Sequence, residues 1–193
     1  MADKTFVGGG GIIYRAEAGT EFPAITNGIS GYGTALTSAG FVEVGEVAED
    51  GLTFGNSIEK AEVKNWYGSV LRVLYTGHTE TFTFNSLDFV DFETQKSAFG
   101  SNNVEQAAAA TNDHGAITKI SFTGKAPEAC AWCIVMADGD KTAIFQIEKG
   151  QTEVGEIQFT KDDVAKTPIT LTAVKGSGDA TVVMLTDDGV KSA

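Results

Sequence analysis

The sequence predicts a mainly β protein, an antiparallel β-sandwich or barrel with one short flanking α-helix. Apolar and polar residues alternate with a period of two from the middle of the chain onwards, as they do in half-buried strands. The alternating runs end repeatedly in turns rich in Gly, Asp or Asn. Helical segments that would carry crossovers between parallel strands are missing between the runs, so neighbouring strands are expected to be antiparallel.

Strands are expected in segments that share this alternation: 70–76, 79–87, 117–122, 131–137, 142–148, 153–159, 169–174 and 181–185. The pair Asp138-Gly139 stands between two of these segments and is the typical signal of a tight hairpin. A second hairpin is expected to close through residues 175–179, which contain Gly176 and Gly178.

One short helix is expected between residues 87 and 99. Asp88 or Asp91 can cap its N-terminus, and Gly100 follows as a stop signal. Residues 105–110 have high helix propensity but no apolar stripe to pack, so a helix, a variable loop and a strand all stay open there.

The first forty residues differ from the rest of the chain. Four consecutive glycines at 8–11, and more glycines up to Gly40, leave too little side-chain surface for this segment to fold alone. It is expected either to become ordered against its own core or another subunit, or to be a flexible leader. We expect one domain over residues 1–193, with an N-terminal arm and first strands in 1–40 and a sandwich core in 41–193.

The chain is strongly acidic, with 14 Lys and Arg against 26 Asp and Glu and a formal net charge of −12. This charge disfavours ordinary nucleic-acid binding, because such binding needs a basic surface. It agrees with a surface along which DNA slides without sticking, and equally with a protein whose acidity only maintains solubility. Residues 1–17 lack the apolar core of a signal peptide and no apolar run is long enough to span a bilayer, so synthesis and folding in a cytoplasm and no membrane partner are expected.

The two cysteines, Cys130 and Cys133, have the spacing of redox and zinc motifs, but they are expected on a strand. Residues three apart on a strand point to opposite faces, with Cα atoms roughly 10 Å apart. A disulfide needs Cα atoms within about 7 Å. A second Cys or His pair for zinc is missing, since His78 and His114 stand in separate predicted turns. Both thiols are therefore expected to fill core space beside Trp132.

Other chemical motifs are equally unsupported. The sequence has neither a nucleophile elbow nor a phosphate-binding glycine loop. The acidic groups near Glu46 and Asp88 contain no pair that stands out as catalytic, and the loop around Gly139 lacks the oxygen ligands of a calcium-binding loop. We expect no catalytic residue, cofactor or metal site.

The aromatic residues are more informative. Phe82 and Phe84 share one face of a strand and Thr81 and Thr83 the other, which predicts one core face and one polar face. Trp66 and Tyr67 precede Gly68 after a charged, alternating stretch, and they are expected to face either a neighbouring protein or the core.

A series of short motifs follows in a fixed order along residues 41–178. The motifs are Gly45-Glu46-Val47, Asp50-Gly51, Trp66-Tyr67-Gly68, the strand of Arg72, Thr81 to Phe84 leading to Leu87-Asp88, Phe99-Gly100, Ala131-Trp132, Asp138-Gly139, Val154-Gly155-Glu156 and Gly176 to Gly178. Their order and spacing resemble those of phage tail tube proteins, especially those of long, non-contractile tails of the siphophage type in actinobacteriophages. The resemblance covers about three quarters of the chain; the cysteine pair and the alanine run depart from it.

The resemblance implies a β-sandwich with one helix whose copies form hexameric rings, joined through their inner sheets and stacked into a tube that conducts double-stranded DNA. It implies a virion protein assembled in the host cytoplasm, with tail initiator or baseplate, tape measure and tail terminator proteins as partners. The N-terminal arm and the loop leading to Trp66 are implied to contact adjacent rings. Candidate subunit-contact residues are Ile12, Ile13, Tyr14, Trp66 and Tyr67. An Ig-like binding or decoration module is the alternative; it would stay monomeric.

Overall fold

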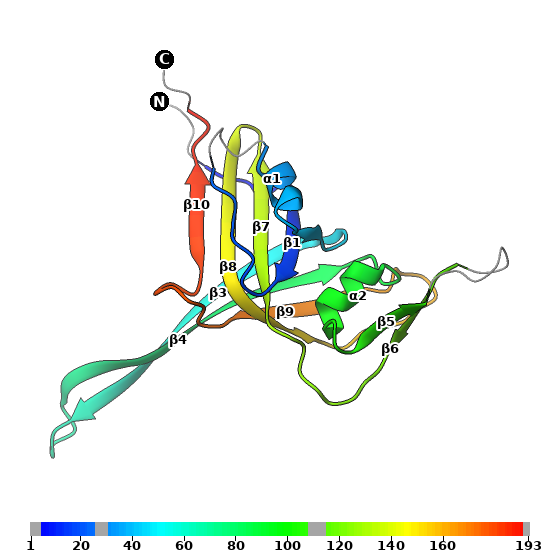
Figure 1. The fold of residues 1–193 in the computed structure, drawn as a ribbon. Coiled ribbons are helices and arrows are strands. Elements are labelled where there is room, and N and C mark those ends of the chain that lie inside the picture. Colours follow the sequence, from blue (N-terminus) through cyan, green and yellow to red (C-terminus); the bar gives the residue numbers. More distant parts are fainter. Residues whose placement is uncertain (1–4, 26–30, 108–114, 191–193) are drawn as a thin grey trace.

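The computed structural model describes residues 5–25, 31–107 and 115–190. Strands dominate it, as expected, and Figure 1 shows two groups of strands that cross each other, with a long two-stranded hairpin projecting from the body. In the described part of the chain, no helix is long and apolar enough to cross a membrane.

The first group of strands contains the N-terminal strand. β1 (Gly11–Glu17) lies between the short β2 (Val42–Glu43) and β7 (Cys130–Asp138), and β7 pairs with β8 (Lys141–Val154), all antiparallel. The predicted tight hairpin joins β7 to β8: Gly139, with φ of 62°, occupies the first position of a two-residue turn. β10 (Val183–Asp187) pairs with the first half of β8.

The second group of strands continues from the other end of β8. Residues 150–154 of β8 pair with β9 (Thr167–Ala173), which pairs with the inner end of β4 (Val70–Ser86), which pairs with β3 (Val47–Lys64). β8 therefore belongs to both groups and connects them at one side of the sandwich. Gly150 lies at this junction, opposite both Cys130 and Ala173.

The main core lies between the two groups of strands. Trp132, Ile147 and Leu171 are among its fully buried side chains, and Phe82 and Phe84 point into it as predicted. The same face holds Cys130, whereas Cys133 packs on the opposite face of β7. The predicted alternation of the two thiols is thus confirmed.

Two helices cover parts of the strands. α1 (Tyr32–Ser38), which the sequence analysis did not predict, packs Tyr32 and Leu36 on the outer face of β1 and β7 in a second apolar cluster. α2 (Phe92–Phe99) is the predicted helix; Asp91 caps it by accepting from the Thr94 amide at 2.8 Å, and Gly100, with φ of 87°, follows its last residue. Thr152 of β8 donates to the Ser97 carbonyl at 2.9 Å and holds α2 in place.

Several predicted boundaries were wrong. Residues 76–79 are not a turn, because β4 runs through them and His78 pairs opposite Ile58. The strand predicted at 153–159 ends at Val154. β3 was not predicted as a strand, yet it is among the longest of the described strands. Its charged outer half has no buried face and therefore lacks the apolar alternation that marks a half-buried strand.

The hairpin predicted at 175–179 was also wrong. β10 pairs with β8 and not with β9, so residues 174–182 form a connection between separate strands. The Glu148 carboxylate anchors this connection, accepting from the amide and hydroxyl of Ser177, each at 2.9 Å, and these hydrogen bonds lower the pKa of Glu148.

The open choice at residues 105–110 is settled in part. β5 (Val104–Ala107) is a strand that pairs with β6 (Ile117–Ile120) in a separate two-stranded sheet. Residues 108–110 and His114 lie outside the described residues.

Candidate subunit-contact surfaces

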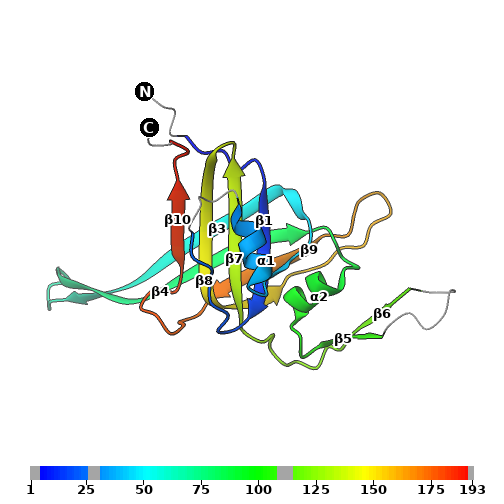
Figure 2. The same cartoon turned by 45° about the horizontal axis from the view of Figure 1, so that its top comes forward.

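The outer parts of β3 and β4 form a hairpin arm, residues 58–75, that extends away from the sandwich in both views of the molecule (Figures 1 and 2). Its side chains are exposed, although β4 reads Val-Leu-Arg-Val-Leu-Tyr over residues 70–75. Leu71, Tyr75 and Ile58 are 67%, 72% and 53% exposed. Contiguous exposed apolar surface of this kind marks a site of protein contact.

The tip of the arm presents two aromatic side chains. Trp66 is 98% exposed and Tyr67 is 90% exposed, so both face solvent in the isolated subunit and neither packs in its core. The turn that carries them is well defined: the Asn65 side-chain oxygen accepts from the amides of Tyr67 and Ser69 at 3.0 and 2.9 Å, and Gly68 has φ of 80°. The tip therefore holds its aromatic residues in a fixed turn before any partner binds.

The arm also leaves backbone groups open for pairing. β9 pairs with β4 only over residues 81–86. Within the described chain, residues 70–80 of β4 therefore pair with β3 on one side and have no strand partner on the other. Two irregularities in the register, at Thr76 and Leu71 of β4, place an extra residue opposite β3. Bulges of this kind bend a strand pair and increase its twist, so they set the direction in which the tip points.

The N-terminal segment before β1 lies along the β7–β8 turn. The Val7 amide donates to the Asp138 carboxylate at 3.0 Å, and the Ala137 amide donates to the Gly10 carbonyl at 3.1 Å. Of the predicted contact residues in β1, Ile12 is 44% exposed, whereas Ile13 and Tyr14 are buried in the two apolar clusters of the subunit. Ile12 alone of the three presents its side chain at the surface.

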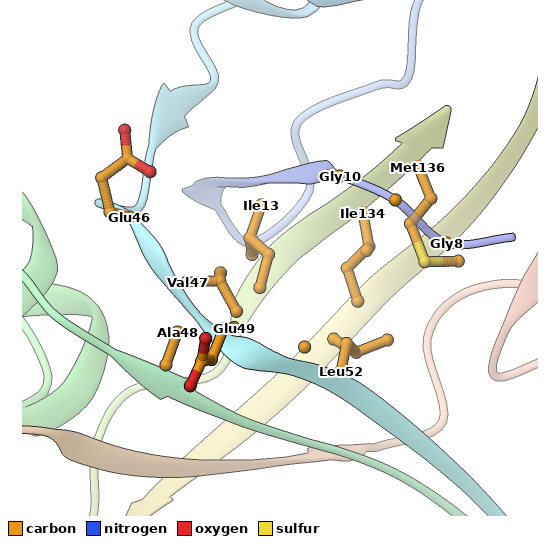
Figure 3. Close-up of a pocket in the computed structure, with 13 residues that line it drawn as sticks. Gly8, Gly10, Ile13, Glu46, Val47, Ala48, Glu49, Leu52, Ile134 and Met136 are labelled. Carbon is orange, nitrogen blue, oxygen red and sulfur yellow. The ribbon is translucent and has the colours of Figure 1, made fainter. Parts of the chain in front are cut away.

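A pocket of about 240 Å³ opens between this N-terminal segment and the start of β3 (Figure 3). Ile13, Ile134 and Met136 form its apolar base, together with Leu52 from β3. Glu46 and Glu49 lie at its rim and are exposed. Sequence reasoning missed this pocket because its walls come from three separated segments.

A hydroxyl-rich face covers the side of β3, β4, β9 and the end of β8 that points away from the core. The register aligns one row of side chains across four strands: Thr53, Thr83, Thr170 and Glu153. A second row contains Gly55, Thr81, Thr172 and Gln151. Neither row contains a Lys or an Arg. The threonine face, as we name these two rows, is the polar face predicted from Thr81 and Thr83.

Comparison with known proteins decides the family. A model of the phage tail tube protein family matches residues 1–193. The chain belongs to this family. Among solved structures, the chain is similar to the tube terminating cap of the anti-feeding prophage, determined by cryo-electron microscopy, with 11% identity, a TM-score of 0.45 and coverage of 97% of this chain and 95% of that chain. No curated protein matches it.

Family membership makes this tail tube protein a structural component of a phage tail, and it implies self-assembly into a tube alongside other tail proteins. It favours a structural role over an enzymatic one and over an Ig-like binding module. The exposed surfaces described above are therefore the candidate sites at which copies of the tail tube protein contact one another.

The cysteine, histidine and acidic side chains of the tail tube protein lie in surroundings typical of structural residues. Burial raises the pKa of the Cys133 thiol to about 12, which suppresses the reactive thiolate. Within residues 5–25, 31–107 and 115–190, no group of three His, Cys, Asp or Glu side chains is arranged to hold a metal ion. His78 lies 3.4 Å from Glu80 on the exposed arm base.

Proposed function

We propose that six copies of this tail tube protein close a ring and that rings stack into the DNA-conducting tube of a non-contractile, siphophage-type tail. The observation that carries the proposal is the hairpin arm, whose exposed apolar side chains and open strand edge need other copies to cover them. Strand edges that pair between neighbours in a closed ring leave no edge free for aggregation, and stacking along the axis stays open-ended.

In this proposal the threonine face lines the lumen. Its rows carry no positive charge, so they offer the DNA phosphates no ion pairs that would slow the passing duplex. Hydroxyl groups and the carboxylate of Glu153 keep the surface wetted. The opposite face of the same strands is filled by the core and is unavailable for lining a channel.

Contacts between subunits are assigned to the exposed candidates. We infer that Trp66 and Tyr67 at the arm tip and Ile12 beside the N-terminal segment contact neighbouring copies, while Ile13 and Tyr14 serve the subunit's own packing. The whole chain, residues 1–193, forms a single domain that assembles in the host cytoplasm. Tail initiator or baseplate, tape measure and tail terminator proteins are its partners within the virion.

Negative-stain electron microscopy tests the proposal. The purified protein, alone or seeded with tail-tip complexes, is expected to form hollow tubes or six-fold rings. A variant in which Asn-Gly replaces residues 59–77 joins Ile58 to His78, which face each other in the register, and should fold but fail to assemble. Circular dichroism and thermal unfolding verify its fold. A wild-type protein that stays monomeric even when seeded, or a trimmed variant that builds normal tubes, would refute the proposal.

A further inference from the structure

The tip of the hairpin arm is a basic aromatic knob. Trp66 and Tyr67 are almost fully exposed, and Lys64 and Arg72 flank them on the two strands. In the isolated subunit Lys64 forms an exposed ion pair with Glu62 at 3.0 Å, which it would exchange for the pocket's carboxylates. Residues 58–75 contain three basic and two acidic side chains, a net charge of +1. The whole chain has a net charge of −12, so the residues outside the arm together carry −13. The arm is therefore a positively charged segment on a strongly acidic protein.

The pocket in Figure 3 has the complementary character. Its base is apolar, from Ile13, Ile134 and Met136. The exposed Glu46 and Glu49 line it on the side where β3 begins, with the Glu46 carboxylate turned outward (Figure 3). A Cβ atom added at Gly8 or Gly10 would meet no atom within 4 Å, so packing does not demand glycine at either position. The glycines instead leave the mouth of the pocket without side chains.

The knob and the pocket of one subunit cannot meet. Leu52 lines the pocket, and the twelve residues of β3 that follow it, 53–64, separate it from the tip turn that carries Trp66. At about 3.3 Å per residue the tip lies roughly 40 Å from the pocket. Both views show the arm pointing away from the body, in agreement with this estimate (Figures 1 and 2).

We propose that the Trp66–Tyr67 tip of one subunit inserts into the pocket between the N-terminal glycines and β3 of a second copy. Lys64 and Arg72 of the inserted tip then face Glu46 and Glu49 at the rim. The inference rests on the proposed assembly into a tube and specifies one of its contacts. Knob and pocket are different surfaces, so the contact is heterologous and propagates from copy to copy, as a ring or a stack requires.

Charge selects this pocket over larger hollows of the described body. One of about 720 Å³ is lined by Glu21 and Glu148 but also by Lys149 and Lys175, so its charges balance. A groove of about 620 Å³ runs between the end of α2, β6 and the end of β8. Its rim mixes Lys125 with Glu153, so it offers a basic knob no net attraction. Complementary charges at an interface favour the correct encounter and penalise the wrong one.

Charge exchange tests the proposal. K64E/R72E and E46K/E49K are each expected to raise the protein concentration needed for tube formation about thirtyfold, because each reversal brings like charges together at the interface. Combining all four substitutions should restore most of the assembly, because the charges are again complementary. The pair K119E/E105K, which reverses the exposed ion pair between β6 and β5, is the matched control and should assemble normally. Failure of the combined variant to recover, or an equal defect in the control, overturns the assignment.

Cross-linking gives an independent reading. In tubes assembled from the double variant Tyr67→Cys with Glu49→Cys, disulfides should form between copies. Because every subunit carries both cysteines, the oxidised protein should run as a ladder of multimers on a non-reducing denaturing gel. Tyr67→Cys with Lys125→Cys, and each single variant, should not. Tubes without the ladder, or a ladder from the Lys125 pair, overturn the pocket while leaving the tube function intact. The absence of tubes from the unmodified protein would overturn both.

Discussion

Arg15 on β1 lies 3.4 Å from Glu93 on α2, joining two elements 78 residues apart through an ion pair whose arginine side chain is only 9% exposed. Arg15 also donates to the Ser101 hydroxyl at 3.2 Å. The pair ties the helix to the N-terminal strand, so the position of β1 and the seating of α2 depend on each other.

Glu93→Gln is therefore expected to lower the free energy of unfolding by about 1–2 kcal/mol, because it leaves a buried guanidinium without its countercharge. The exposed pair Lys119–Glu105 supplies the control, with side chains 69% and 78% exposed. Glu105→Gln should change the free energy by less than about 0.5 kcal/mol. Urea unfolding of both variants checks this, and equal effects would contradict the structural role of the pair.

Gly150 is predicted to tolerate no side chain. A Cβ there would lie 2.6 Å from Leu171 Cδ1 and 3.0 Å from Trp132 Cδ1, at the point where β8 passes from one group of strands to the other. Gly150→Ala should cost about 1–3 kcal/mol through overpacking. Gly10→Ala, in open space, should leave thermal unfolding unchanged. A Gly150→Ala protein as stable as wild type would show that the junction is loosely packed.

The buried thiol predicts a loss of stability in alkali. The pKa of Cys133 is about 12 in the folded protein, against about 8.5 for an unfolded thiol. Above the lower value the unfolded chain loses a proton that the folded chain retains, so stability falls as pH rises from 9 toward 12. The slope from this group is at most about 1.4 kcal/mol per pH unit.

Chemical unfolding of wild type and Cys133→Ala between pH 8 and pH 11 isolates this effect. Wild type should lose more stability than the variant over the range. Part of the difference comes through Tyr14 and Tyr32, because burial and also the neighbouring Cys133 raise the pKa of each. Parallel pH profiles would mean that Cys133 does not titrate differently in the two states.

Positive charge on the threonine face is predicted to hinder DNA. Thr83→Lys places a lysine in the row that joins Thr53 to Thr170, on an exposed position that does not touch the core. Tubes should form, but DNA release from virions carrying the variant should be slower and should recover with added salt. Thr83→Ser is the control. Unchanged release by the Thr83→Lys virions would argue that this face does not line the channel.

Local sequence signals predicted the features that depend on neighbours in the chain. The Asp91 cap and Gly100 stop marked α2, Asp138-Gly139 marked the β7–β8 turn, and alternation placed Phe82 and Phe84 in the core. Each signal reflects backbone geometry or side-chain direction within a few residues.

Features that depend on distant partners were missed. The 175–179 segment has the composition of a hairpin, yet Glu148 holds it as a connection between strands that do not pair. His78 reads as a turn residue after Gly77, yet the long pairing of β3 with β4 carries the strand through it. Ile13 and Tyr14 appear equivalent to Ile12 in the sequence, but β1 lies between two packed layers that bury both of them.

By itself, the sequence determined the mainly β class, the short capped helix, the opposite faces of the two thiols and the likeness to tail tube proteins, because these depend on periodicity, turn chemistry and motif order. Only the tertiary structure decided that β8 serves both groups of strands, that the arm leaves Trp66 and Tyr67 in solvent, and that Glu46, Glu49 and the N-terminal glycines surround one pocket. Those relationships arise from long-range pairing and packing, which residue-by-residue patterns do not encode.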